Sequence, residues 1–442
     1  MVQDNSLLTD LYELTMVDAY LADGMLDTAV FEFFVRRLSR NRGFLLAAGL
    51  EQLIDYLGSL RFGGRALEWL SRSGRFSRRL IDYLSAFCFR GDVYAMPEGT
   101  VFFGDEPIVR IVASLPEAQL IESRLINIMH FQTLIASKAA RLVLAADGKQ
   151  LVDFGLRRAH SAEAGLLAAR AAYIAGFSGS ATVLVDAAFG VPAFGTMAHA
   201  FIQAHENEEQ AFEHFASARP EGIVLLIDTY DVGRAAKKVV RLAMRLAARG
   251  IGIEGVRIDS GDLSAQSRMV RHILDAGGFP RIRIFASGDI DEADLIAFAR
   301  DHVPIDSCGI GASLDVSTDA PVLDCAYKLE EYAGIPRRKR SEGKATWPGR
   351  KLVWRRQDVG GTFSSDMITL TSEPGVGEVL LQPVLRAGRR CASTPSLRAI
   401  RDRAAQQLAQ LPFPLRTLKS IVYPVEISAT LKQLAEACDR RV

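Results

Sequence analysis

The sequence is poor in cysteine and has no excess of charge of either sign. Its 442 residues include five cysteines, and 53 basic residues stand against 52 acidic ones, a formal net charge of +1. None of the cysteines forms a CxxC pair, so neither a zinc site nor a disulfide framework is indicated. The charge balance argues against a general nucleic-acid or anionic-membrane surface, whereas a phosphate-rich small ligand needs only a local basic pocket.

Long uncharged hydrophobic runs are also missing. No stretch is long enough to span a bilayer, and the N-terminus lacks a basic region followed by an apolar one. With 49% hydrophobic and 24% charged residues, the composition is that of an ordinary globular protein. We therefore expect a soluble, cytoplasmic protein with reduced thiols, large enough for a barrel and a companion domain.

The first third of the chain has the pattern of a mixed α+β domain. Helical spacing predicts a helix over about 8–22, with Thr9 as its N-cap, and a second helix over 50–57. A strand is expected at 29–35, and short β-like runs broken by Pro and Gly follow. A long helix over 117–145 then leads into a different pattern.

From about residue 150, short apolar runs alternate with helical stretches such as 232–249 and 263–276. The runs are QLVDFG, TVLVDAAFG, GIVLLIDTY, IEGVRIDSG, RIRIFASG and IDSCGIGAS. Repeated βα units predict parallel strands, and continuous apolar runs predict strands buried on both faces. The number of units favours an irregular TIM-type α/β barrel over an open sheet, although counting leaves closure open.

These patterns divide the chain into four parts. We expect an N-terminal α+β domain over 1–115, a linking helix over 116–145, the α/β barrel over 146–336 and a C-terminal segment over 337–442 that packs back on the N-terminal domain. The chemistry is expected in the barrel, because the residues that follow barrel strands line the active-site face.

Three successive strand ends carry polar or glycine-rich motifs. The motifs VRIDSGDL, FASGDID and CGIGAS contribute Arg257, Asp259, Ser260, Gly261 and Asp262, then Ser287, Gly288 and Asp289, then Gly309 and Gly311. A cation beside carboxylates can bind an anion and ribose hydroxyls, and glycines let backbone amides hold phosphate. Each motif alone is weak, since a GxG turn is more often only a tight turn and either aspartate could merely cap a helix. Together they predict a phosphorylated-sugar site.

A fourth motif, GTMAHAF at 195–201, contains His199. This histidine is either a polar core residue near a helix start or a catalytic base or phospho-acceptor, since imidazole is nucleophilic at neutral pH. Asp228 and Asp259 are the candidates to orient its ring. His160 is a lesser candidate for chemistry, and the other five histidines have the surroundings of structural or solvated residues.

The ordered motifs together resemble the nicotinate phosphoribosyltransferases, with the nicotinamide and quinolinate enzymes as relatives. They extend through nearly the whole chain and include LLTDLYELTM, VFEFFVRR, DFGLRRAH, GFSGSATVL, GTMAHAF, VRIDSGDL, SGDID, GIGASLDVS, YKLEEYAG, SEGKATWPGRKLVWR and YPVEIS. The resemblance implies an enzyme of NAD salvage that condenses nicotinate with phosphoribosyl pyrophosphate, giving nicotinate mononucleotide and pyrophosphate. It also implies coupling to ATP hydrolysis through a phosphohistidine.

The resemblance further implies cofactors, partners and roles for single residues. Mg²⁺ would bind mainly through substrate phosphates, with no certain protein ligand, and a homodimer or higher homo-oligomer would share its active sites. His199 would be phosphorylated by ATP, and Asp259 would act with it and contact ribose. Phe154 and Tyr12 would stack on the two faces of the pyridine ring, Tyr12 from a second subunit, with core packing as the alternative for both. The other implied substrate contacts are Arg36, again across the dimer, and Arg157, Thr196, Arg257, Ser287, Gly288, Asp289, Gly309 and Gly311.

One position bears on the choice between acid and amide. Nicotinamide-using relatives carry an aspartate two residues after the glycine of the GFSG-like segment, where this chain has Ala181 after Gly179. A carboxylate there would repel nicotinate, so alanine favours the acid. The chain departs from most bacterial members after DFGLRR, where HSAEAGLLAARAAY is more like archaeal members, which leaves nearby contacts and the oligomer open.

Several alternatives stay open at this point. The chain could be a nicotinamide phosphoribosyltransferase of the same fold, or a non-catalytic barrel that binds phosphorylated sugars. A barrel lyase or isomerase with a Schiff-base lysine is weaker, because Lys328 has no evident activating partner. Lys344 and Arg350 belong either to a solvated basic loop or to a loop that contacts phosphate.

Overall fold

The computed structural model describes residues 6–419 and 421–441, and it divides the chain into two compact units. The first unit combines Met1–Ser137 with Ala320–Val442, and the second is Lys138–Asp319. The first unit thus takes in both the N-terminal and the C-terminal parts expected from the sequence. The expected barrel segment, 146–336, extends past the second unit, because its last two strands, at 325–332 and 335–336, pair in the sheet of the first unit.

An antiparallel sheet of seven strands organises the first unit, in the order β13-β12-β1-β5-β3-β17-β18. The strands are β1 (Thr28–Val35), β3 (Asp92–Ala95), β5 (Pro107–Ser114), β12 (Cys325–Tyr332), β13 (Ile335–Pro336), β17 (Gln382–Arg386) and β18 (Arg389–Arg390). All residues of β1 after its first are buried, since β5 and β12 flank it and the sheet faces are covered. Through its pairing with β3, β17 ties the C-terminal segment to the N-terminal sheet.

Two smaller sheets and nine helices complete the described part of the first unit. The strands are β2 (Leu45–Leu46), β4 (Val101–Phe102), β14 (Lys351–Gln357), β15 (Phe363–Leu370), β16 (Glu378–Val379) and β19 (Val425–Ile427). The helices are α1 (Leu11–Ala22), α2 (Leu50–Ser59), α3 (Gly64–Arg72), α4 (Arg78–Ser85), α5 (Leu115–Leu120), α6 (Glu122–Ala145, which continues into the second unit), α15 (Leu397–Ala409), α16 (Phe413–Arg416) and α17 (Ala429–Asp439).

Two helix predictions in this unit need correction. The N-cap of α1 is Asp10 and not Thr9, whose hydroxyl instead donates to the carboxylate of Glu13 one turn later. The helix expected over 117–145 is in fact two helices, α5 and α6, with Ile121 as the C-cap of the first. The apolar periodicity runs through both helices, which is why the sequence pattern hides the break.

The second unit is built on six parallel strands in the order β7-β6-β11-β10-β9-β8. They are β6 (Gln150–Asp153), β7 (Gly179–Ser180), β8 (Ile223–Leu226), β9 (Ile253–Ile258), β10 (Arg283–Ser287) and β11 (Ser307–Ile310). This is the order of a barrel opened between β7 and β8, which form no pairing in the described residues. Between them the chain makes a single bridge, Ala193 to Ser180, in place of a ladder. The unit is therefore a curled parallel half-barrel, and the predicted closed barrel is not confirmed.

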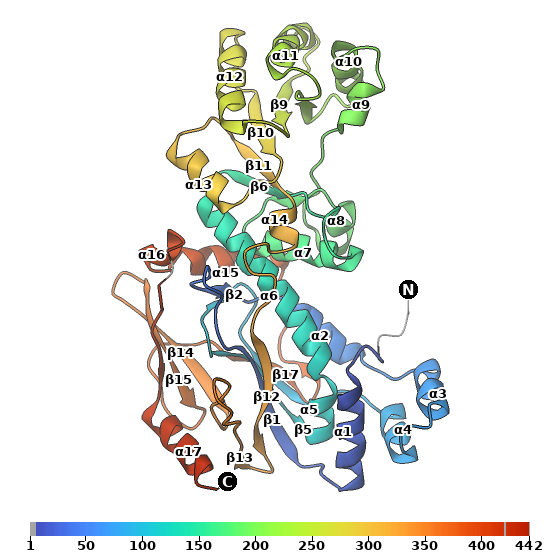
Figure 1. Cartoon of the computed structure of the whole chain (residues 1–442), viewed down its shortest axis with the longest axis vertical. Coiled ribbons are helices and arrows are strands. Elements are labelled where there is room, and N and C mark those ends of the chain that lie inside the picture. Colours follow the sequence, from blue (N-terminus) through green and yellow to red (C-terminus); the bar gives the residue numbers. More distant parts are fainter. Residues whose placement is uncertain (1–5, 420, 442) are drawn as a thin grey trace. The chain divides into compact units, whose positions relative to one another are not determined.

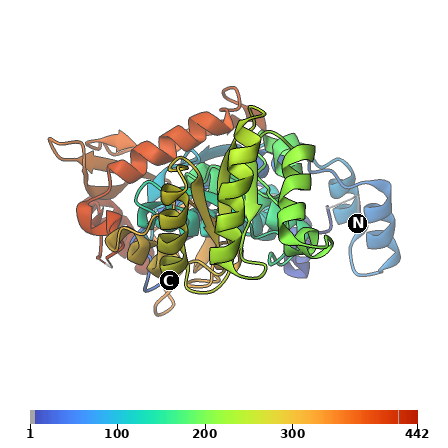
Figure 2. The same ribbon diagram turned by 90° about the horizontal axis from the view of Figure 1, so that it is seen from above.

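Helices cover this sheet on the outside. They are α7 (Ala162–Ala175), α8 (Val183–Phe189), α9 (His199–Gln203), α10 (Glu208–Ala218), α11 (Val232–Ala247), α12 (Leu263–Ala276), α13 (Glu292–Arg300) and α14 (Ala312–Asp315). Figures 1 and 2 show α10, α11 and α12 packed side by side. The run TVLVDAAFG, expected as a strand, forms α8 instead, and Val183 and Leu184 are exposed on it. No helix in the described part of the chain combines the length and hydrophobicity needed to cross a bilayer.

Candidate functional site

The carboxyl ends of β9 and β10 bring a cation and a carboxylate into direct contact. Arg257 donates from Nη2 to Asp259 Oδ1 at 2.7 Å and from Nε to Ser287 Oγ at 2.9 Å. The Ser287 hydroxyl in turn donates to the same Asp259 oxygen. These side chains come from neighbouring parallel strands, whose ends meet at one edge of the sheet. Arg257 thus presents a guanidinium whose orientation is fixed on two sides.

Charge and hydrogen bonding at this edge act on Asp259 in opposite directions. Partial burial alone raises the pKa of its carboxyl, but the hydrogen bonds from Arg257 and Ser287 and the charge of Arg257 outweigh it, so that the pKa lies below its ordinary value. Asp259 is consequently ionised at neutral pH. The neighbouring Asp262 has the structural role that the sequence left open for either aspartate, because it caps α12 by accepting from the Ala265 amide at 2.9 Å.

The turn after β10 requires its glycine. Gly288 has φ of +107°, and a Cβ at this position would lie 2.2 Å from the carbonyl oxygen of Asp259. Any side chain here would therefore push the end of β9 away from the end of β10. Asp289, the next residue, also has a positive φ of +52° and is exposed.

His199, the first residue of α9, faces this cluster and is partly exposed. Its Nδ1 lies 3.0 Å from the hydroxyl oxygen of Thr229, and its Nε2 lies 3.9 Å both from Asp228 Oδ1 and from Asp259 Oδ2. Both carboxylates expected from the sequence as partners are thus near the same ring nitrogen. Thr229, which fixes the other nitrogen, was missed by sequence reasoning, although its place after β8 in IDTY was the available signal.

Asp228 is the buried member of this group. Its Oδ2 accepts from the Asp259 amide at 3.0 Å and from the Ser260 hydroxyl at 2.6 Å, whereas Oδ1 has no hydrogen-bond partner and faces His199 Nε2. The free acceptor favours a cation on the imidazole side, because a buried carboxylate oxygen without a donor costs stability. An imidazolium, or a metal ion held by a ligand, would satisfy it.

Phe154 lies directly after β6 and provides an aromatic face beside Arg257. The ring stacks on Phe285 with a centroid separation of 5.5 Å, and the Arg257 guanidinium carbon is 5.4 Å from the Phe154 centroid. A Cβ on Gly309 would lie 2.7 Å from the Phe154 ring, so this glycine makes room for the ring. Gly311 has no such constraint, since its nearest neighbour would be 3.8 Å away, and the α14 that follows has only four residues.

The remaining predicted contacts fall in two places. Thr196 accepts from Arg257 Nη1 at 3.2 Å and so joins the strand-end cluster, whereas Arg157 is exposed in the turn that follows Phe154. Tyr12 and Arg36 belong to the first unit, where Tyr12 is exposed on α1. Burial and then the charge of Glu122 raise the pKa of Tyr12 to about 12, so its hydroxyl is neutral at physiological pH.

Arg36 lines a basic pocket of about 290 Å³ in the first unit. The other lining residues are Arg37, Asp105, Arg338, Gly343, Ala345, Thr346 and Trp347. Arg36 pairs with Asp324 at 3.1 Å, but its Nε is buried without an acceptor, as is the Nε of Arg338. This pocket can therefore accept an anion. Arg350 is engaged with Glu331 at 2.7 Å, while Lys344 lies exposed in the loop between two lining residues.

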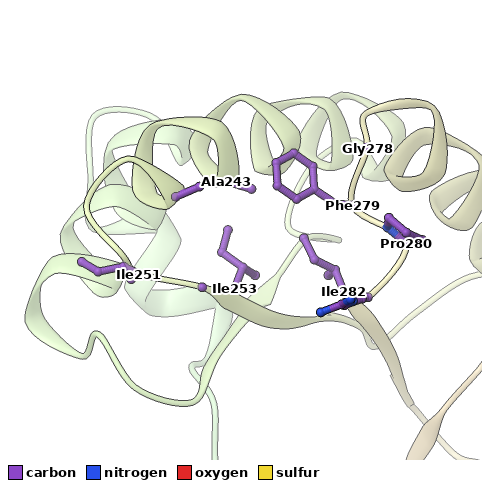
Figure 3. Close-up of a pocket in the computed structure, with 10 residues that line it drawn as sticks. Ala243, Ile251, Ile253, Gly278, Phe279, Pro280 and Ile282 are labelled. Carbon is purple, nitrogen blue, oxygen red and sulfur yellow. The ribbon is translucent and has the colours of Figure 1, made fainter.

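A separate cavity of about 300 Å³ lies at the opposite end of the half-barrel (Figure 3). It is lined by the segments that lead into β9 and β10 and by the end of α11, with Ile253, Phe279 and Ile282 among the apolar side chains. The polar cluster is at the carboxyl ends of these strands, so the cavity is not part of it. Among the described residues, no group of three or more His, Cys, Asp or Glu side chains is arranged to hold a metal ion.

The second unit thus has an arginine, carboxylates and a histidine together at the carboxyl edge of its parallel sheet. This arrangement is typical of a class of enzymes that bind an anionic, phosphorylated substrate at that edge. Family models describe the chain more closely. The nicotinate phosphoribosyltransferase N-terminal domain matches residues 7–130, the nicotinate phosphoribosyltransferase family model matches 149–330 and the C-terminal domain matches 376–435. The chain belongs to the nicotinate phosphoribosyltransferase family.

Individual relatives agree with this assignment. The chain is 44% identical to the nicotinate phosphoribosyltransferase pncB2 of Mycobacterium tuberculosis over 426 residues, which cover 96% of this chain and 91% of the relative. It is 40% identical to the nicotinate phosphoribosyltransferase of Bacillus subtilis, covering 79% of this chain and 73% of the relative. The crystal structure of human nicotinic acid phosphoribosyltransferase has a TM-score of 0.87 and 28% identity, covering 97% of this chain and 99% of that one.

Proposed function

We propose that this chain condenses nicotinate with phosphoribosyl pyrophosphate to nicotinate mononucleotide and pyrophosphate, as a step of NAD salvage. The observation that carries the proposal is the Arg257–Asp259 pair beside Phe154, which puts a fixed cation next to an aromatic face. The cation suits a pyridine carboxylate and the ring suits stacking. The names of the 44% and 40% identical relatives support the same reaction.

The decisive experiment is a product assay. Purified protein is incubated with phosphoribosyl pyrophosphate, Mg²⁺ and either nicotinate or nicotinamide, with and without ATP, and the nucleotides are separated by chromatography. We expect nicotinate mononucleotide from nicotinate and little product from nicotinamide. Equal turnover of the two rings would favour the nicotinamide-using alternative, and absence of both products would reject a phosphoribosyltransferase.

In the reaction, positive charge develops at ribose C1 as pyrophosphate leaves and the pyridine nitrogen attacks. The residues of this chain hold the reactants in line, which is a large source of rate enhancement. Arg257 orients the acidic ring against Phe154, and the ionised Asp259 lies where it can bind ribose hydroxyls. Mg²⁺ fits this carboxylate-rich edge as an ion bound mainly by substrate phosphates, with Asp228 Oδ1 as an available acceptor. When bound, such an ion would supply positive charge to the leaving pyrophosphate.

His199 is the proposed phospho-acceptor for ATP. Its partly exposed ring lies between Thr229 on one nitrogen and two carboxylates on the other. The two carboxylates and the Thr229 hydroxyl lie on opposite sides of the ring and so can fix its orientation. A phosphoryl group on His199 would place a third anionic group beside Asp228 and Asp259. Besides the charge of the pyrophosphate, this is a reason why the reaction would need a divalent cation.

Tyr12 and Arg36 are proposed to serve the active site of a neighbouring subunit. The exposed Tyr12 ring is available to stack on the pyridine, and the basic pocket around Arg36 and Arg338 is suited to the phosphates of the neighbour's ligand. Lys344 is proposed to contribute to the same pocket. The chain would then act as a homodimer or a higher homo-oligomer with shared active sites.

Mixing two variants that each lack ATP-stimulated activity tests the shared site. Tyr12→Ala subunits lack a proposed ring contact, and His199→Ala subunits lack the phospho-acceptor. In a random mixture of dimers, about a quarter of the sites contain neither change, so about that share of the ATP-stimulated activity should return. The measurement is ATP-stimulated product formation after mass spectrometry has verified subunit exchange. Exchange without any recovery, or full activity in a monomer, contradicts the shared site.

Introducing a carboxylate at position 181 tests the preference for the acid. Ala181 is exposed, and its amide donates to the Asp153 carbonyl at 2.8 Å, so the position adjoins the end of β6 that precedes Phe154. Ala181→Asp should raise the KM for nicotinate about tenfold by charge repulsion. Ala181→Asn is the matched control of the same size, and it should change this KM far less. Similar KM values for both variants would place the nicotinate carboxylate elsewhere.

A further inference from the structure

Two carboxyl groups face each other in the interior of the second unit. Asp153 ends β6 and is 1% exposed, and Asp315 ends α14 and is 2% exposed. Buried carboxyls of this kind are normally paired with a cation or a full set of donors. The motif GIGASLDVS contains Asp315 as well as its two glycines, and no step of the proposed reaction uses this aspartate.

The two carboxyls differ in their hydrogen bonds. Asp153 accepts from the Gly155 amide at 2.7 Å through Oδ1 and from the Ser180 hydroxyl at 2.6 Å through Oδ2. Neither oxygen of Asp315 accepts a hydrogen bond from a described group, and its side-chain contact is with the Asp153 carboxyl. Two carboxylates are both acceptors, so such a contact needs a proton between them. That proton belongs to Asp315, because Asp153 already has two donors.

The backbone around the pair shows how closely it is built. A Cβ on Gly155 would lie 2.1 Å from the Asp315 carboxyl carbon, so Asp315 occupies the space that a side chain at residue 155 would fill. Gly155 follows Phe154, and Ser180 precedes Ala181. Through the hydrogen bond from Ser180, the pair therefore joins two short segments. Segment 153–155 contains Phe154, and segment 180–182 contains Ala181.

We propose that Asp315 is a positioning and specificity-determining residue for an anionic ring. Asp315 is the protonated member of the pair, and through its contact with Asp153 it holds the two segments together. The pair then has one negative charge near the ring site instead of two. The inference rests on the proposed function in so far as the ring is nicotinate. A second charge at this place would oppose the substrate carboxylate in the same way as an aspartate at position 181.

The surroundings of Asp315 determine when it ionises. Helix α14 packs against α7, and Ser313 on α14 donates to the carbonyl of Ile290. The charged groups on the neighbouring elements are Asp153 on β6, Glu163 and Arg170 on α7, and Asp289 and Asp291 on either side of Ile290. Burial, and after it the charge of Asp153, raises the pKa of Asp315 to about 9. Asp315 is therefore neutral at pH 7 and ionises in the alkaline range.

Asp315→Asn tests the proposal, because the amide is the same size, stays neutral and still donates to Asp153. In the wild type, the KM for nicotinate should rise about tenfold from pH 7.5 to pH 10 through the added charge. The asparagine variant should lack this excess rise while keeping its KM at pH 7.5 within about twofold. Asp275→Asn, which removes an exposed carboxylate on α12, is the control that should keep the wild-type profile. Coincident KM profiles of Asp315→Asn and wild type would overturn the proposal.

A second variant and a spectroscopic measurement cover the case in which Asp315→Asn does not fold. Asp153→Asn removes the charge that opposes ionisation of Asp315, so the rise in KM should move to lower pH. The infrared C=O band of protonated carboxyls, followed from pH 7 to pH 10, should lose intensity around pH 9 in the wild type and at lower pH in Asp153→Asn. A loss that is the same in both proteins belongs to other buried carboxyls such as Glu330, whose burial raises its pKa to about 8. An unchanged band and an unshifted KM rise would both count against the shared proton. A wild type without nicotinate mononucleotide formation would reject the proposed function, and the infrared titration would still decide the protonation of the pair.

Discussion

Replacing His199 by alanine is expected to abolish ATP hydrolysis and all stimulation of product formation by ATP, while unstimulated transfer persists. The imidazole is the proposed acceptor of the phosphoryl group, whereas the ring contacts at Arg257 and Phe154 do not involve it. Transfer without ATP should therefore stay within about tenfold of the wild-type rate. Wild-type protein incubated with labelled ATP should carry acid-labile, base-stable phosphate on His199, and the variant should carry none.

The control for this experiment is His272→Ala, which removes an exposed histidine from α12. It should keep both ATP stimulation and labelling. If His199 is only a packed residue, alanine should lower the melting temperature and leave the dependence on ATP unchanged. Wild-type protein that hydrolyses ATP without ever labelling at His199 would contradict the assignment directly.

Replacing Arg257 by alanine should have the second large effect. Three of its contacts, to Asp259, Ser287 and Thr196, would be lost together with the cation beside Phe154. We expect kcat/KM for nicotinate to fall about 10²- to 10³-fold, a range that is typical of removing one preorganised hydrogen-bond donor from an active site. Arg257→Lys keeps the charge but not the two-sided geometry, and it should fall between the wild type and the alanine variant.

The same substitution has a defined pH dependence. Arg257 is a main reason why the pKa of Asp259 lies below its ordinary value, so this pKa should rise in Arg257→Ala. A depressed carboxyl pKa contributes stability that is present above the unfolded-state pKa and lost as pH falls through the folded-state pKa. The variant should therefore lack part of the acid-dependent loss of stability seen in the wild type, measured as melting temperature between pH 6 and pH 3.

Arg283→Ala is the matched control for Arg257→Ala. Arg283 begins β10 at the opposite end of the sheet, where its side chain is exposed and paired with Glu254 at 3.3 Å. It should leave kcat/KM and the acid limb of stability unchanged. A comparable loss of kcat/KM from both arginines would show that the effect is a general one of charge or stability and not a property of the strand-end cluster.

Sequence patterns predicted the parallel unit well because its signals are local. The buried strand β8, for example, appears as a continuous apolar run, and α11 and α12 have clear caps and helical periodicity. The run TVLVDAAFG became α8 because an apolar stretch of this length fits either structure, and its first residues turned out to be exposed. Periodicity alone cannot separate these cases, since it says nothing about what covers the run.

By itself, the sequence determined the family and the order of strand-end motifs, because both are properties of residues close together along the chain. The opening of the barrel between β7 and β8 depends on pairing between distant segments. So do the contact of Thr229 with Nδ1 of His199 and the contact of Asp153 with Asp315, which lie more than 160 residues apart. Only the tertiary structure could decide these features. A carboxyl acquires its charge state from what surrounds it in space, and the chain brings those surroundings together from several strands.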